Sequence, residues 1–138
     1  MPTVEITIER VAITAHPLSS GSVTRNIMKL SDMQYSVGIT NLAAYRNTGK
    51  FTCEQEGLYI ISASVMSLSS GAEFYIYMNG NIISETYIAQ NNNNNEKHTG
   101  AVTITQELNQ NDKVWLYATG SFYLYGGLQS TLTIVKIK

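Results

Sequence analysis

The side chains best suited to chemistry in this sequence are two histidines, His16 and His98, and a single cysteine, Cys53. His16 stands before a proline and His98 follows a run of asparagines, so the two lie in unrelated contexts. A catalytic site needs a nucleophile, a base and an orienting group, or a set of metal ligands. None of the motifs H-E-x-x-H, G-x-S-x-G, P-loop or C-x-x-C is present, and the carboxylates are scattered. The sequence therefore predicts a protein that is not an enzyme.

Binding without catalysis is favoured by the residue types in surplus, which are asparagine, glutamine, serine and tyrosine. Such amides, hydroxyls and aromatic rings hydrogen-bond to sugars and stack on them, and loops at the ends of a rigid β scaffold commonly carry binding residues. The candidate surfaces are the segments 91–98, 109–113 and 120–127. The candidate contact residues are Asn92, Asn93, Asn94, His98, Asn111, Tyr123 and Tyr125.

Two of these features have an alternative interpretation. Tyr123 and Tyr125 would point the same way in a strand, and they fit a subunit seam as well as a ligand surface. The five consecutive asparagines in segment 88–100 disfavour helix and strand, which predicts a surface loop. That loop is either a plain connection or a site where amide oxygens and Glu96 bind a hard cation.

The charge balance excludes several classes of partner. The chain carries 9 basic and 10 acidic residues, so no basic excess exists to neutralise phosphates, and we expect no nucleic-acid partner. Apolar runs are too short to span a membrane, and we expect no membrane insertion.

At 138 residues we expect one domain, 1–138. The start "MPT" leads directly into alternation, so we expect no signal peptide, as in a cytosolic protein or the mature part of a secreted one.

Strand patterns recur about every ten residues, whereas helix patterns are nearly absent. Examples are "VEITIERVAITA", "GLYIISASV", "TGAVTITQEL" and "STLTIVKIK", and Asn79-Gly80 is a favoured hairpin turn within "AEFYIYMNGNIISETYI". About ten strands in one domain predict an all-β sandwich or jelly roll. Segments 74–78 and 114–117 are apolar on both sides, which predicts either a subunit interface or tyrosines that lie half exposed.

Several blocks carry a more specific signal. Asn41, Tyr45, Phe51, Gly57 and Tyr59 follow one another in an order that resembles the globular domain of the complement C1q family, with "TGKFTC" and "GLY" as the nearest match. "RVAITAH", "YIYMNGNII", "LNQNDKVWLYA" and "STLTIVKI" resemble further blocks of that family, in the same order. The resemblance covers nearly the whole chain and identifies it as a C1q-like protein.

Departures mark a divergent member. Asn111 replaces a usual glycine, Ile61 and Ala63 stand where aromatic residues are common, and the spacings on either side of Tyr45 are each one residue short. No Gly-X-Y tract is present. This pattern is typical of stalkless invertebrate members, especially molluscan ones.

The resemblance implies a ten-stranded jelly-roll β-sandwich, shared with the tumour necrosis factor superfamily, that assembles as a homotrimer. It implies that Cys53, on the same strand face as Phe51, is an unpaired and buried thiol. Several relatives bind calcium, so Asp112 and Glu73, with Asp32 as a further donor, are the candidate ligands of a possible calcium ion.

The function that the resemblance implies is a secreted, extracellular pattern-recognition lectin of innate immunity, which binds carbohydrates on microbial surfaces. Two alternatives remain. One is a structural, extracellular-matrix or metal-binding trimer, and the other is a cytokine-like ligand of a protein receptor.

Overall fold

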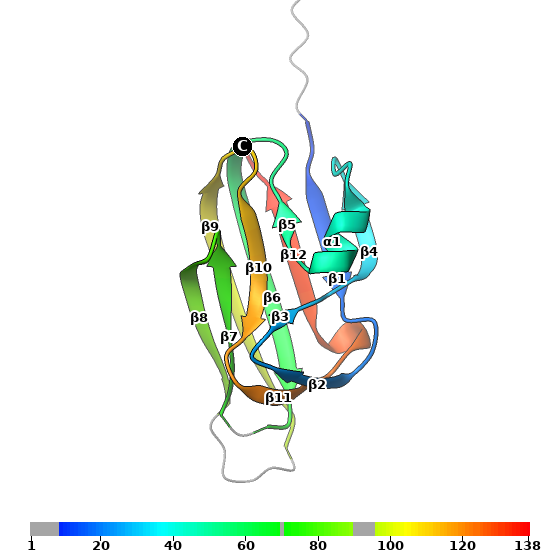
Figure 1. Ribbon diagram of the computed structural model, residues 1–138, viewed down its shortest axis with the longest axis vertical. Coiled ribbons are helices and arrows are strands. Elements are labelled where there is room, and N and C mark those ends of the chain that lie inside the picture. The colour runs from blue at the N-terminus through cyan, green and yellow to red at the C-terminus, as the bar shows by residue number, and fades with distance from the viewer. Residues whose placement is uncertain (1–8, 70, 90–95) are drawn as a thin grey trace, which may run out of the picture.

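The computed structural model describes residues 9–69, 71–89 and 96–138, and they form two antiparallel sheets packed face to face (Figure 1). Sheet I has the strand order β4-β1-β12-β6-β9. Its strands are β4 (Asp32–Val37), β1 (Ala12–His16), β12 (Thr131–Lys136), β6 (Gly57–Ser67) and β9 (His98–Leu108).

Sheet II has the order β3-β10-β7-β8, and β5 also pairs with β10. Its strands are β3 (Ile27–Met28), β10 (Lys113–Ala118), β7 (Ala72–Met78), β8 (Asn81–Ala89) and β5 (Phe51–Thr52). The ten strands of the two sheets confirm the expected jelly roll. A ribbon of β11 (Ser121–Leu124) and β2 (Gly21–Thr24) lies at one end (Figure 1). The turn η1 (Gly127–Gln129) leads into β12.

The core lies between the sheets and follows from the alternation in the strands. In β6 every second side chain from Tyr59 to Ser67 is buried, and in β12 Leu132 and Ile134 face the same interior. The hairpin between β7 and β8 turns at Asn79 and Gly80, which both have positive φ (53° and 88°), as the sequence predicts. Of the predicted strand "VEITIERVAITA", residues up to 8 lie outside the described part, and β1 begins at Ala12.

One helix was not expected from the pattern. α1 (Leu42–Thr48) begins where the Asn41 side chain accepts a hydrogen bond from the Ala44 amide (3.1 Å), and it ends at Gly49 in the left-handed region (φ 74°). Tyr45 is its buried residue, and the Tyr45 hydroxyl donates to the Leu30 carbonyl (2.7 Å). The helix therefore closes the side of the sandwich near β5.

The strands that are apolar on both sides carry an aromatic cluster on the outward face of sheet II, formed by Tyr75, Tyr77, Trp115 and Tyr117. The Tyr77 and Trp115 rings are stacked, with centroids 5.7 Å apart and planes at 4°, and Tyr117 meets Tyr77 edge-on at 5.3 Å. The Lys50 ammonium lies 4.4 Å from the Trp115 centroid. These rings cover one another within one subunit and are half-buried. Their role in a subunit interface stays a prediction.

Candidate functional site

Tyr123 and Tyr125 form an aromatic pair on the ribbon at one end of the sandwich. The residues between and before them, Phe122 and Leu124, are buried, so the two tyrosines project from the opposite side of the strand. Their ring centroids are 5.0 Å apart at an interplanar angle of 71°. The prediction that they point the same way is confirmed.

The end of β6 holds this pair in place. The Tyr125 amide donates to the Met66 carbonyl (3.1 Å), and the Tyr123 amide donates to the Ser69 hydroxyl (3.1 Å). The Ser130 hydroxyl donates to the Tyr125 carbonyl (2.6 Å). Because backbone groups are fixed on both sides of the pair, the rings are presented on a rigid support.

Charged groups from the start of β9 complete the site. Lys97 places its ammonium 4.9 Å from the Tyr125 centroid. His98 pairs with Ser67 in the ladder, and its Nε2 lies 3.7 Å from a Glu96 carboxylate oxygen. We call Ser69, Lys97, His98, Tyr123 and Tyr125 the tyrosine patch.

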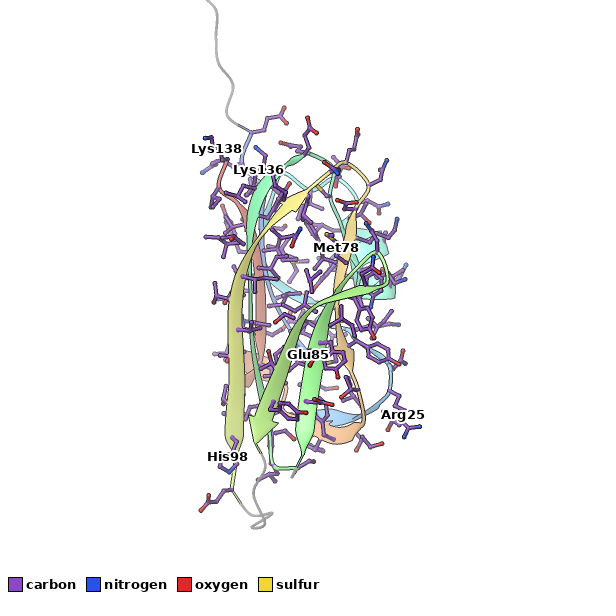
Figure 2. All side chains as sticks on the ribbon, turned by 90° about the vertical axis from the view of Figure 1, so that its left-hand side faces the viewer. Arg25, Met78, Glu85, His98, Lys136 and Lys138 are labelled. Carbon is purple, nitrogen blue, oxygen red and sulfur yellow. The ribbon has the colours of Figure 1, made fainter. Side chains whose placement is uncertain are left out.

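The structure thus brings together three of the predicted contact residues, His98, Tyr123 and Tyr125. Figure 2 shows His98 at the end of the molecule opposite to Lys136 and Lys138. Asn92, Asn93 and Asn94 lie outside the described residues, and their role stays a prediction. Sequence reasoning gave Lys97 no role of its own within the candidate segment 91–98 and missed Ser69, because only the pairing of distant strands places them beside the tyrosines.

Asn111 and Asp112 lie at the opposite end, in the turn between β9 and β10. Asn111 has φ 76°, a conformation that glycine adopts most easily, which explains why glycine is usual at this position. Its amide donates to the Cys53 carbonyl (2.7 Å), and the Cys53 amide donates to the Asp112 carbonyl (2.7 Å). Asn111 is therefore a turn residue that is remote from the tyrosine patch, and a ligand contact there would be a separate site.

The carboxylate of Asp112 joins two turns. One oxygen accepts from the Asn79 side-chain amide (2.8 Å) and the other from the Asn109 backbone amide (2.7 Å). Glu73 lies at the other end of β7, where one oxygen accepts from the Thr119 hydroxyl (2.8 Å) and the other is buried with no hydrogen-bond partner. Since Asn79 is six residues from Glu73, roughly 20 Å along a strand, the two carboxylates cannot ligate one ion.

A calcium site is therefore not assembled by these residues. Within the described part of the chain, no group of three or more histidine, cysteine, aspartate or glutamate side chains is positioned to hold a metal. Asp32 begins β4 and faces His16 in the ladder, away from Glu73 and Asp112. Calcium binding stays a prediction.

The histidines do not share a site. His16 is buried, its Nδ1 hydrogen-bonds the Ser130 carbonyl (2.8 Å), and its Nε2 hydrogen-bonds the Gln34 side chain. Strands β12 and β6 separate β1 from β9, which puts His16 and His98 at least roughly 14 Å apart. The bonds of His16 tie β1 to β4 and β12, so its role is structural.

Cys53 is unpaired and completely buried, as predicted. Its thiol donates to the Gln55 carbonyl (3.1 Å) and lies 3.6 Å from the Tyr59 hydroxyl. Burial raises the pKa of the thiol, which keeps it protonated and unreactive. The lone cysteine is therefore a core residue rather than a functional one.

The turn carboxylates predict a loss of stability in acid. The hydrogen bond from Asn79 lowers the pKa of Asp112, and hydrogen bonds from Thr40 lower the pKa of Glu54. A lowered carboxyl pKa stabilises the fold fully above the unfolded value, about pH 4, and the contribution is lost as pH falls through the folded value. We expect the free energy of unfolding, measured by urea denaturation, to decrease below about pH 4.

In an Asp112→Asn variant, the free energy of unfolding should depend less on pH than it does in the unmodified protein. An Asp32→Asn variant, which removes an exposed carboxylate of β4, should change the profile less. Equal profiles for the Asp112→Asn variant and the unmodified protein would contradict the assigned role of Asp112.

No helix of the described residues is long and apolar enough to cross a membrane.

The sequence matches the family model described as the C1q domain over residues 28–133. Among curated proteins, none matches the chain.

Solved structures show the same fold at low identity. The globular domain of zebrafish complement 1qA has a TM-score of 0.71 at 13% identity, covering 93% of this chain and 98% of that chain. Eiger TNF from S. frugiperda has a TM-score of 0.72 at 10% identity, covering 94% and 92%. Murine APRIL has a TM-score of 0.70 at 10% identity, covering 94% and 100%.

Proposed function

The chain belongs to the C1q domain family, and from this premise we propose that it is a secreted lectin that binds carbohydrates on microbial surfaces in innate immunity. Domains of this family are non-enzymatic ligand-binding modules and are typically extracellular. The observation that carries the proposal is the tyrosine patch, where the exposed Tyr123 and the half-buried Tyr125 are rigidly supported and bordered by a cation and a hydroxyl. The ring of Tyr123 stacks on the C–H face of a sugar, and Lys97, His98 and Ser69 hydrogen-bond its hydroxyls.

Trimeric assembly is the second part of the proposal, and the outward face of sheet I supports it. Its central row consists of four hydroxyl residues in register, which hydrogen-bond pairwise across the strands at 3.2 and 3.0 Å. On four of its five strands, β1, β12, β6 and β9, the outward side chains within two residues of this row carry no charge. We call them the hydroxyl face: Ala12, Thr14, Ile60, Ser62, Ser64, Ala101, Thr103, Thr105, Thr131, Thr133 and Val135.

Absence of charge over a broad sheet face is typical of the centre of a subunit interface. The outward face of sheet II carries three charged residues, Glu73, Glu85 and Lys113, whereas these four strands of sheet I carry one, Glu107 near the end of β9. We therefore assign the trimer contact to the hydroxyl face. Three copies present three tyrosine patches, and linked weak sites gain avidity.

The test is a glycan array with labelled protein, run once in calcium and once in a chelator. Selective binding is expected, and Tyr123→Ala should weaken it about tenfold per site. Tyr87→Ala, which removes an exposed tyrosine of β8, is the matched control and should leave binding unchanged. Binding that survives the chelator would assign recognition to tyrosine and amide contacts, whereas loss would show calcium dependence. Folded trimer that binds no glycan would refute the lectin proposal.

A cytokine-like ligand of a protein receptor is the second candidate, because Eiger TNF and APRIL match the fold as well as complement 1qA does. Saturable binding to a protein ectodomain that free sugar does not inhibit would favour this candidate. High-capacity metal binding without sugar affinity would instead favour a matrix role.

A further inference from the structure

A cavity of about 390 Å³ opens between α1 and β5, at the end of the sandwich opposite to the tyrosine patch. Its floor consists of three buried core residues, Ile13, Tyr45 and Phe51. Leu42 and Ala44 of the helix form one wall. The volume lies within the range of small-molecule sites, roughly 300–1,000 Å³. The cavity is therefore large enough for a small ligand with an apolar body.

The mouth of this cavity is cationic. Lys50 and Lys113 both line it, and the Lys50 ammonium lies 4.4 Å from the centroid of the neighbouring Trp115 ring. The acidic residue at the mouth is Glu54, whose two oxygens accept from the Thr40 amide (2.9 Å) and the Thr40 hydroxyl (2.6 Å). Both Glu54 oxygens thus have partners within the protein, and the two lysines exceed its single negative charge by one.

The polar groups of the floor are also used internally. The Tyr45 hydroxyl donates to the Leu30 carbonyl, and Ile13 and Phe51 have no polar side-chain atoms. The three floor residues offer no free partner to the hydroxyls of a sugar, and burying unpaired hydroxyls on them is costly, whereas an alkyl or aromatic body would replace water on their apolar surface. The cavity thus differs in chemistry from the tyrosine patch.

We propose that this cavity binds a small amphiphile with one anionic group, such as a medium-chain carboxylate. The apolar chain packs on Ile13, Tyr45 and Phe51, and the carboxylate lies between Lys50 and Lys113. This site is independent of glycan binding, because none of its residues belongs to the tyrosine patch or the hydroxyl face.

The first test is calorimetric titration of the unmodified protein with octanoate, hexanoate, octanol and octylammonium. Octanoate should bind about fifteenfold tighter than hexanoate, since each buried methylene contributes about fourfold. Octanoate should also bind more tightly than octanol, and octylammonium should bind most weakly. Lys113→Gln should weaken the binding of octanoate up to about fivefold and leave the binding of octanol unchanged. Equal affinity for octanoate and octylammonium, or no binding of octanoate, would overturn the proposal.

The second test locates the site. Ala44→Phe fills the cavity and should abolish octanoate binding, whereas Ala43→Phe, on the exposed side of the same helix, should not. Amide NMR spectra of the unmodified protein give an independent readout that needs no variant. Octanoate should shift the amides of Thr40, Ala44 and Thr52, and shifts confined to Tyr123 and His98 would refute the location.

Discussion

A Ser62→Lys variant is expected to be a folded monomer of 15.2 kDa, whereas the unmodified protein should have three times that mass in sedimentation or light scattering. Ser62 lies at the centre of the hydroxyl face, between Thr133 and Thr103 in the ladder. A lysine there projects into solvent in the single chain but would be an unpaired buried charge in a trimer, which costs several kcal/mol per subunit.

The control is Ser22→Lys, the same change on β2, outside both main sheets. It should leave the trimer intact. A circular dichroism spectrum that is unchanged in both variants separates lost assembly from lost folding. A trimeric Ser62→Lys protein would place the interface elsewhere, with the aromatic cluster of sheet II as the next surface to test.

Gly38→Ala should lower the free energy of unfolding by about 2–5 kcal/mol, the largest loss expected among the glycine positions of this chain. Gly38 follows β4 with φ +74°, and a Cβ there would lie 2.0 Å from the Arg10 carbonyl oxygen. The left-handed backbone costs an alanine about 1–2 kcal/mol, and the clash with backbone adds about 1–3 kcal/mol. Urea denaturation measures the sum.

Gly80→Ala separates the two contributions. Gly80 has φ +88°, and a Cβ there would meet nothing within 4 Å. This variant should therefore lose only the conformational part, about 1–2 kcal/mol. Equal losses at both positions would show that β4 and the segment before β1 move apart without cost.

Much of the fold follows from alternation in the sequence. The sequence predicts the long strands β6 and β9 and the hairpin around Asn79-Gly80. In each of them apolar side chains recur at every second position over many residues. The short strands β3 and β5 have two residues each, which is below any detectable period, and pairing with β10 defines them. Helix α1 has too few turns to show periodicity, although an asparagine before it and Gly49 after it are its end signals.

The candidate site was predictable only in part. Local alternation was sufficient to put Tyr123 and Tyr125 on one side of a strand. Their proximity to His98 and Lys97, in contrast, depends on the ladder of β6 with β9 and on the contact of Tyr125 with Met66. The separation of Glu73 from Asp112 has the same origin, because β7 runs the length of the sandwich between them.

The placement of the first and last strands has a mechanical consequence. The Lys136 amide donates to the Val11 carbonyl (2.9 Å), and Ala12 lies opposite Val135, so the two ends of the described chain are antiparallel neighbours at one end of the molecule. Tension between these ends acts along the hydrogen bonds between β1 and β12, which lie perpendicular to the strands. The ladder then opens one pair at a time, as a zipper does, instead of resisting with all its bonds in shear. A weak force that pulls these two ends apart should therefore be enough to separate β1 from β12.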